Sequence, residues 1–201
     1  VVAGTYLGAI LATGGEGKIN GINPDHLPME VKKFESMGGH FNIENNSIEV
    51  STQGELVATE IATLPFPGVA TDLQPIFGAT LLKAKGTSII TENVYDQRFQ
   101  WIPEVERMGA DVQIGYQHAM IKSVNKLSGA PVNSTDIRTG ASLIIAALQA
   151  EGESTITGID HIERGYENIV SLLKSIGSEI EYNWIMVDIN LPKVKDRNPS
   201  S

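Results

Sequence analysis

The apolar positions of this chain form two kinds of helical pattern. In the first kind, apolar residues recur at i, i+3, i+4 and i+7, which predicts an amphipathic helix over roughly 165–176 and counterparts earlier in the chain. The residues that carry this pattern are Ile169, Leu172, Leu173 and Ile176; Leu27, Val31 and Phe34; and Phe99, Ile102, Val105 and Met108. The second kind is almost uninterruptedly apolar, over 76–82 and 143–148, and it predicts helices buried within a core.

The ends and polar faces of the amphipathic segments are also marked. A glycine follows each segment, at the position where a residue in the left-handed conformation often ends a helix. These glycines are Gly38, Gly109 and Gly177. In the first segment, charged residues lie between the apolar ones and predict a face turned toward solvent. They are Glu30, Lys32, Lys33 and Glu35.

Alternating strands follow each of these helix ends. Phe41 and Ile43 are followed by Ile48 and Val50 across the polar residues 45–47, which predicts a β-hairpin. The residues that begin two further predicted hairpins are Val112 and Ile114, and Ile180 and Tyr182.

The elements recur three times in the same order. Gly17, Gly86 and Gly152 stand at equivalent places and are 69 and 66 residues apart. We therefore predict one α/β domain over 1–191, a threefold repeat of βαβαββ units around the buried helices. The units span about 1–63, 64–128 and 129–191, and the polar residues 192–201 are predicted to form a tail.

Composition narrows the class of protein. Fifteen Lys and Arg against 24 Asp and Glu give a net charge of −9, which disfavours a nucleic-acid partner because phosphate backbones require clustered basic residues. The chain has no cysteine and four scattered histidines, so neither a disulfide scaffold nor a metal site is predicted.

No apolar run approaches the ~18 residues of a membrane span, and no signal peptide pattern occurs. We expect a cytoplasmic protein without a membrane partner. Because the chain begins with Val1 rather than Met, we also expect a piece of a longer protein.

Two Thr-Asp pairs are candidates for chemistry. Asp72 and Asp136 each follow a threonine just before a predicted buried helix. Asp and Thr at such positions commonly cap the helix, and for each pair alone capping is favoured over catalysis.

Three arginines add weight to a functional site. Arg98 and Arg164 occupy equivalent places in the second and third units, and Arg138 follows Asp136 by two residues. In a closed threefold arrangement these side chains and helix N-termini would converge at one end of the domain. Arginine and helix N-termini both bind carboxylate and phosphate, so a small anionic substrate is one interpretation. The other is that each arginine forms a surface ion pair with a neighbouring carboxylate.

At these residues the sequence resembles the UDP-N-acetylglucosamine 1-carboxyvinyltransferase family, more than the sister family that makes enolpyruvylshikimate phosphate. The matching motifs are TDLQ (71–74), TENVYDQRF (91–99), KLSGAPV (126–132), TDIR (135–138) and HIERGYE (161–167). The resemblance implies two lobes of three βαβαββ units each, described as inside-out α/β barrels. It also implies transfer of the enolpyruvyl group of phosphoenolpyruvate to the 3-hydroxyl of UDP-N-acetylglucosamine. Phosphate leaves, and the product is committed to peptidoglycan, the cell wall that shapes dividing cells.

The resemblance implies roles for six residues of this sequence. Asp72 would contact the sugar hydroxyl and take its proton, and Asp136 would serve proton transfer at the enolpyruvyl methylene. Val94 would contact the nucleotide sugar. The arginines that would hold the carboxylate and phosphate of phosphoenolpyruvate are Arg98, Arg138 and Arg164. No cofactor is implied.

The resemblance covers about half of the family's chain. The first lobe of the same chain would supply the remaining site residues, including a mobile loop with a Cys or Asp acid, so the fragment alone is expected to be inactive. Two alternatives stay open. One is an enolpyruvyl transferase with another acceptor; the other is a repeat domain that binds a nucleotide sugar or a protein without catalysis.

Overall fold

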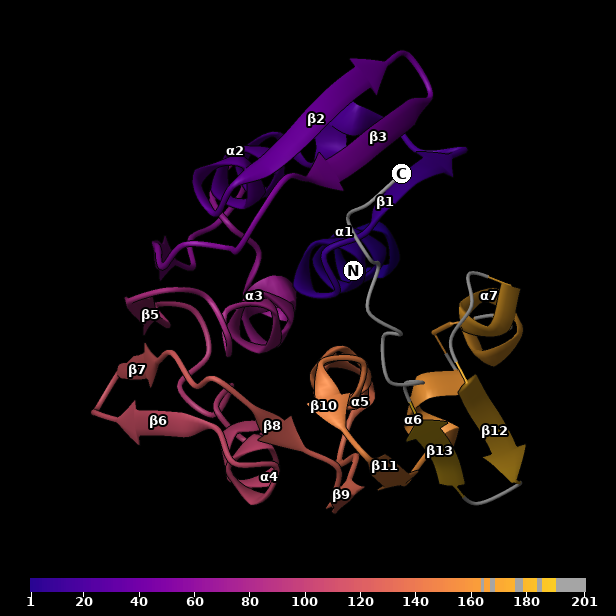
Figure 1. Ribbon diagram of the computed structural model, residues 1–201. Helices are drawn as coiled ribbons and strands as arrows, with labels where there is room; N and C mark the ends of the chain where they lie inside the picture. Colours follow the sequence, from indigo (N-terminus) through magenta and orange to yellow (C-terminus); the bar gives the residue numbers. More distant parts are fainter. Residues whose placement is uncertain (164, 167–168, 176–178, 184–185, 191–201) are drawn as a thin grey trace, which may run out of the picture.

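Three helices lie side by side at the centre of the protein. A computed structural model describes residues 1–163, 165–166, 169–175, 179–183 and 186–190 of the chain. The central helices, seen end-on in Figure 1, are α1 (Val2–Ala12), α3 (Gln74–Thr80) and α5 (Ile137–Ala147). Each packs against the other two, and every residue of α3 is buried. The predicted burial of 76–82 and 143–148 is therefore confirmed.

Three sheets surround these helices (Figure 1). In the first sheet the strand order is β1-β3-β2, with β1 (Glu16–Asn20), β2 (Gly39–Glu44) and β3 (Ser47–Thr52). In the second it is β4-β5-β7-β6, with β4 (Glu60–Ala62), β5 (Thr87–Thr91), β6 (Asp111–Ile114) and β7 (His118–Lys122). In the third it is β12-β13-β11-β9, with β9 (Pro131–Asn133), β11 (Glu153–Thr157), β12 (Glu179–Asn183) and β13 (Met186–Asn190). The short strands β8 (Leu127–Ser128) and β10 (Ala150–Glu151) pair separately.

Further helices and two short 3-10 turns lie around the central helices. They are α2 (Pro28–Ser36), α4 (Ile102–Arg107), α6 (Asp160–Glu163) and α7 (Ile169–Ser175), with the 3-10 turns η1 (Pro24–His26) and η2 (Thr71–Leu73). Gly38 (φ +106°) and Gly109 (φ +92°) follow α2 and α4 in the conformation that favours glycine, as predicted. Gly177 lies outside the described residues. The hairpin between β2 and β3 is also confirmed, with Glu44 paired to Ser47.

Two local expectations are wrong. Glu30, predicted to face solvent, is 4% exposed, and its carboxylate accepts a hydrogen bond from the backbone N–H of Ala70 at 3.3 Å. The amphipathic helix predicted over 165–176 also begins later, because Gly165 lies in a turn and α7 begins at Ile169. A Cβ at Gly165 would meet the end of the Ile137 side chain, which would have to shift to make room for it.

The glycine in the KLSGAPV motif has a packing reason. A Cβ on Gly129 would run into the backbone of Glu153, which cannot rotate away as a side chain could. We expect Gly129→Ala to lower the free energy of unfolding by about 1–3 kcal/mol, the usual cost of overpacking. Urea denaturation measures this. Gly54→Ala is the matched control because a Cβ there meets nothing within 4 Å, and equal losses in both variants would contradict the prediction.

Candidate functional site

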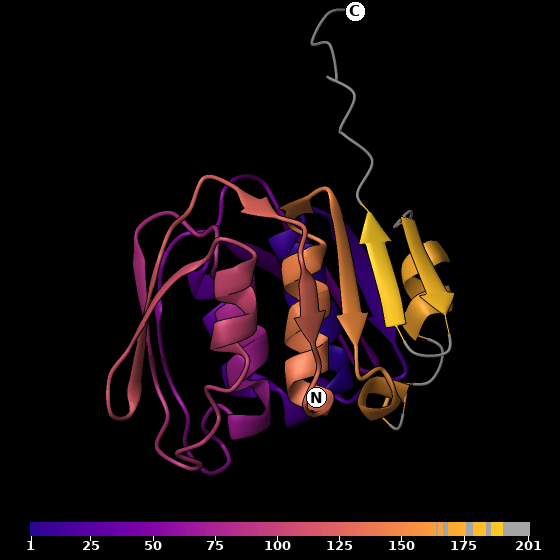
Figure 2. The same cartoon turned by 90° about the horizontal axis from the view of Figure 1, so that it is seen from below.

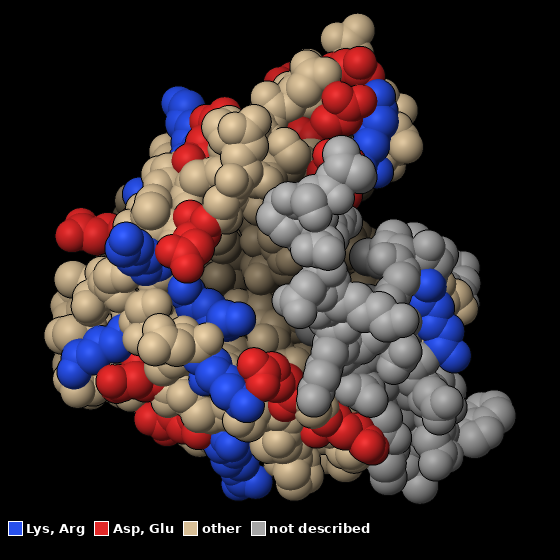
Figure 3. All heavy atoms as spheres, in the orientation of Figure 1, with Lys and Arg blue, Asp and Glu red and all other residues tan. Residues whose placement is uncertain are grey.

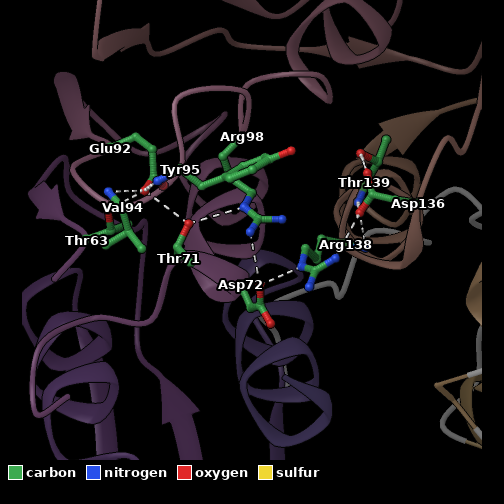
Figure 4. Close-up of polar contacts among 10 residues, drawn as sticks. All are labelled: Thr63, Thr71, Asp72, Glu92, Val94, Tyr95, Arg98, Asp136, Arg138 and Thr139. Carbon is green, nitrogen blue, oxygen red and sulfur yellow. Dashed lines mark hydrogen bonds and ion pairs between the residues drawn. The ribbon is translucent and has the colours of Figure 1, made fainter. Parts of the chain in front are cut away.

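The carboxylate of Asp72 lies between two arginines at the N-terminal ends of α3 and α5. Its Oδ1 is 3.2 Å from Nη2 of Arg98 and accepts a hydrogen bond from Nε of Arg138 at 2.6 Å. Figure 4 shows both guanidinium groups pointing toward Asp72, one from the turn before α4 and one from the first turn of α5. In Figure 2 the N-terminal ends of α3 and α5 lie at the same end of the molecule. The packing of α3 against α5 thus brings Asp72 and Arg138 together, although these two residues are 66 positions apart in sequence.

Asp136 has a different local role. It caps α5, with its Oδ1 accepting the backbone N–H of Arg138 at 2.8 Å and of Thr139 at 3.4 Å. Its Oδ2 accepts the hydroxyl of Thr139 at 2.7 Å, and its Oδ1 lies 3.8 Å from Nη1 of Arg138. Partial burial acts to raise the pKa of Asp136, but these hydrogen bonds and the charge of Arg138 outweigh it and hold the pKa below the ordinary value.

Capping by Asp136 predicts a pH-dependent loss of stability on its removal. Asp136→Ala should lower the free energy of unfolding by about 1 kcal/mol at neutral pH, because two N–H groups lose their acceptor. Since the folded pKa lies below the unfolded value of about 3.9, this contribution is present above that pH and disappears as the pH falls through the folded pKa. Urea denaturation over this pH range measures it. Asp136→Asn, which keeps a capping oxygen, should lose less, and a loss independent of pH would contradict the role of the charge.

The other side of the site contains a buried carboxylate, that of Glu92. Glu92 is 0% exposed, and its Oε1 accepts four hydrogen bonds. The donors are the hydroxyls of Thr63 (2.7 Å) and Thr71 (3.0 Å) and the backbone N–H groups of Val94 (2.9 Å) and Tyr95 (2.9 Å). Arg98 donates in turn from Nε to Thr71 at 3.2 Å, and its guanidinium carbon lies 4.6 Å from the centre of the Tyr95 ring. Arg98 is therefore fixed along its edge and on one face.

A pocket of about 330 Å³ adjoins these groups. Its lining residues are Pro75, Tyr95, Gln97, Arg98, Gln100, Asp136, Arg138 and Thr139. Figure 3 shows basic and acidic side chains next to one another around a hollow on this face of the molecule. Two guanidinium groups and the N-terminus of an eleven-residue helix can bind an anion the size of a carboxylate or phosphate here. Asp136 lines this pocket, and Asp72 adjoins it through its contacts with Arg98 and Arg138.

The predicted site residues meet different outcomes. Asp72, Arg98, Asp136 and Arg138 come together as described above. Val94 is 48% exposed and is attached to the same cluster through its backbone N–H. Arg164 lies outside the described residues. No role was predicted for Glu92, for Thr71 as a link to Arg98 or for Tyr95 beneath Arg98. The one available signal for Glu92 was its place directly after strand β5, whose two isoleucines are its apolar residues.

Within the described part of the chain, no group of three or more His, Cys, Asp or Glu could hold a metal ion. None of the helices there has the length and apolarity to cross a membrane.

The comparisons with known proteins agree on one family and on a partial match. The EPSP synthase (3-phosphoshikimate 1-carboxyvinyltransferase) family matches residues 1–173. A Thermotoga maritima protein named UDP-N-acetylglucosamine 1-carboxyvinyltransferase is 43% identical over 182 residues, which are 90% of this chain and 43% of that protein. UDP-N-acetylglucosamine 1-carboxyvinyltransferase 2 of Geobacillus kaustophilus is 40% identical over 196 residues, 98% of this chain and 46% of that protein. This chain thus spans less than half the length of these relatives.

Solved structures share the fold. The enolpyruvyl transferase NikO from Streptomyces tendae matches with a TM-score of 0.79 at 22% identity, over 94% of this chain and 45% of that one. An EPSP synthase from Acinetobacter baumannii matches with a TM-score of 0.66 at 16% identity, over 94% of this chain and 44% of that one. At these identities the likeness establishes the α/β fold alone.

Proposed function

This chain belongs to the EPSP synthase (3-phosphoshikimate 1-carboxyvinyltransferase) family, and from that premise we propose that it forms one lobe of a UDP-N-acetylglucosamine 1-carboxyvinyltransferase. The proposed acceptor is supported by the names of the relatives with 40–43% identity. The family motifs quoted above favour the same acceptor over a shikimate phosphate. The resulting enzyme would carry out the first committed step of peptidoglycan synthesis in the cytoplasm.

The observation that carries the proposal is the arrangement of Asp72 between Arg98 and Arg138 beside the N-terminus of α5. In the proposed reaction, the 3-hydroxyl oxygen of the sugar attacks C2 of phosphoenolpyruvate while Asp72 takes the hydroxyl proton. C3 gains a proton to give a phosphate-bearing intermediate. Loss of a proton from C3 and of inorganic phosphate then yields the enolpyruvyl ether. Asp136 serves the proton transfers at C3, and Val94 contacts the sugar.

The arginines fit the charge that this reaction develops. Phosphoenolpyruvate and the intermediate both carry a carboxylate and a phosphate, which Arg98, Arg138 and, in this proposal, Arg164 would hold. Fixed guanidinium groups stabilise such an anion without reorganising, because their own positions are already set by Asp72 and Thr71. Asp72 is the counter-ion of the arginines in the free protein and becomes the neighbour of the acceptor hydroxyl when substrate binds.

The same proposal covers the organisation of the chain. We interpret 1–191 as three βαβαββ repeats, at about 1–63, 64–128 and 129–191, forming an inside-out α/β barrel lobe with a polar tail at 192–201. The three sheets around α1, α3 and α5 support this interpretation, although the second sheet already includes β4 at Glu60–Ala62. A second lobe would provide the remaining half of the site. Because catalysis needs both halves closed over the substrates, this chain alone should bind phosphoenolpyruvate weakly and not turn over.

A chimera tests the proposal. The matching 182 residues of the Thermotoga maritima relative are replaced by this chain, and phosphate release is measured. We expect release that requires both phosphoenolpyruvate and UDP-N-acetylglucosamine and does not occur with shikimate 3-phosphate. Activity with a different acceptor alone would establish the alternative transferase. A folded chimera that neither binds phosphoenolpyruvate nor releases phosphate would contradict the proposal and favour a binding module.

A further inference from the structure

In the hydrogen bonds around Glu92, it is fixed which group donates and which accepts. A hydroxyl group carries one hydrogen, and Oε1 of Glu92 is the acceptor in each of its four hydrogen bonds. The hydroxyl of Thr71 therefore donates its hydrogen to Oε1 of Glu92, and toward any other group it can act only as an acceptor. The group that it faces is Nε of Arg98, which can donate but not accept. Figure 4 shows this chain of contacts from Glu92 through Thr71 to Arg98.

The same carboxylate oxygen also sets the surface beneath Arg98. Oε1 of Glu92 accepts the backbone N–H of Tyr95, and the ring of Tyr95 lies against the guanidinium group. One buried atom thus fixes two of the groups that hold Arg98, a hydroxyl at its edge and an aromatic ring at its face, and the ion pair with Asp72 adds to them. The Arg98 side chain is 14% exposed and that of Arg138 is 30% exposed.

We infer that Glu92 is a positioning residue for Arg98, acting through Thr71 and through the turn that carries Tyr95. Its task is to orient the hydroxyl of Thr71 as an acceptor, so that the Arg98 guanidinium is held in place before an anion arrives. The contribution of Arg98 to phosphoenolpyruvate binding rests on the proposed function. The positioning itself is a property of the free protein and can be tested without substrate.

The chain offers a matched pair of substitutions. Thr63 and Thr71 both donate to Oε1 of Glu92, at 2.7 and 3.0 Å, but only the hydroxyl of Thr71 contacts an arginine among the bonds described here. Thr63 instead accepts the backbone N–H of Asn93 at 2.9 Å. Thr71→Val and Thr63→Val therefore remove the same kind of bond from Glu92, and Thr71→Val alone removes the link to Arg98.

The first measurement is hydrogen exchange of the arginine Nε–H groups in the ¹⁵N-labelled chain, followed by NMR. Thr71→Val should speed exchange at Arg98 about tenfold, the effect of losing one net hydrogen bond, and leave Arg138 within about twofold. Thr63→Val should leave both arginines within about twofold. Unchanged exchange at Arg98 in Thr71→Val, or an equal increase at both arginines, would overturn the inference.

Substitutions at Glu92 separate geometry from mere packing. All four bonds fall on one oxygen, so the amide oxygen of Glu92→Gln can accept them, and Arg98 exchange should stay within about twofold. Glu92→Ala removes the acceptor and should raise exchange about tenfold. If Glu92→Ala does not fold, the comparison of Glu92→Gln with Thr71→Val still decides. Faster exchange in Glu92→Gln than in Thr71→Val would contradict positioning through an accepted hydrogen bond.

A second measurement connects positioning to the proposed function. Phosphoenolpyruvate is titrated into the wild-type chain and the two threonine variants, and the dissociation constant is read from chemical-shift changes. Thr71→Val should weaken binding about tenfold and Thr63→Val less than about twofold, with no further effect of Thr71→Val once Arg98 is replaced by Ala. Additive effects in that double variant would overturn the inference. Absence of binding by the wild-type chain would contradict the proposed function, while the exchange data would still decide the role of Glu92.

Discussion

Arg138→Ala is expected to lower kcat/KM for phosphoenolpyruvate by about 10²–10³-fold in the chimera, the usual loss when one fixed donor to a developing anion is removed. Arg138 is held by Asp72 at 2.6 Å and lies on the first turn of α5, where the helix N-terminus adds to its attraction for an anion. Steady-state phosphate release measures the effect. Arg138→Lys should recover part of the loss, because it restores the charge but not the planar fork.

The control for this prediction is a second arginine with the same substitution. Arg107 is 62% exposed and pairs with Glu104 of the same helix at 3.8 Å, so Arg107→Ala should leave kcat/KM unchanged. Loss of activity by similar factors in Arg107→Ala and Arg138→Ala would point to a general disturbance. Full activity of Arg138→Ala would remove this arginine from the proposed site.

The largest effect on stability is expected from Trp101→Ala, which should lower the free energy of unfolding by about 3–5 kcal/mol. Trp101 is fully buried, its ring occupies the space that a Cβ on Gly78 would need, and its Nε1 donates to Oε1 of Gln74 at 3.1 Å. Removing the ring leaves a cavity against α3 and an acceptor without its donor.

Urea denaturation measures this loss, with Tyr116→Ala as the control. Tyr116 is also aromatic but 89% exposed, so its removal should change the free energy of unfolding by less than about 0.5 kcal/mol. A loss below about 1 kcal/mol in Trp101→Ala would mean that the surrounding core collapses into the vacated space.

Local periodicity was sufficient to predict the buried helices and the glycine ends. Segments 76–82 and 143–148 are apolar around their whole circumference, and such a helix has no side that can face water. Gly38 and Gly109 follow regular apolar spacing, so the place where each helix ends is itself a local signal. Arrangements that depend on neighbours within one helical turn are therefore readable from the sequence.

The two Thr-Asp pairs show where local reasoning fails. Asp136 stands directly before α5 and caps it, whereas Asp72 lies inside the 3-10 turn η2, and no side chain caps that turn or α3. The two identical Thr-Asp dipeptides thus have different roles, because Asp72 lies within a 3-10 turn that precedes its helix and Asp136 is itself the residue before α5. Asp72 instead meets Arg98 and Arg138, and those contacts follow from the packing of separate helices.

The buried carboxylates were missed for a related reason. Glu30 is covered where it meets the backbone of Ala70, 40 residues away, and Glu92 collects its hydroxyl donors from Thr63 and Thr71. An acidic residue in a sequence normally indicates solvent, because burying it without partners is costly. The partners of Glu30 and Glu92 approach them when the loops around the second sheet fold together, so local sequence does not identify them.

The hydrogen bond between Thr5 and Tyr166 has a consequence for the order of folding. The two side-chain oxygens are 2.7 Å apart, both residues are buried, and 161 positions separate them in the chain. Burial raises the pKa of Tyr166 to about 12, so its hydroxyl keeps its proton throughout the neutral range. During synthesis, α1 emerges well before Tyr166 exists, and until then α1 can pack against α3, α5 and the strands β1 and β3 without the contact to Tyr166. The contact between Thr5 and Tyr166 therefore forms late, because its long sequence separation requires a large loop to close before the contact contributes.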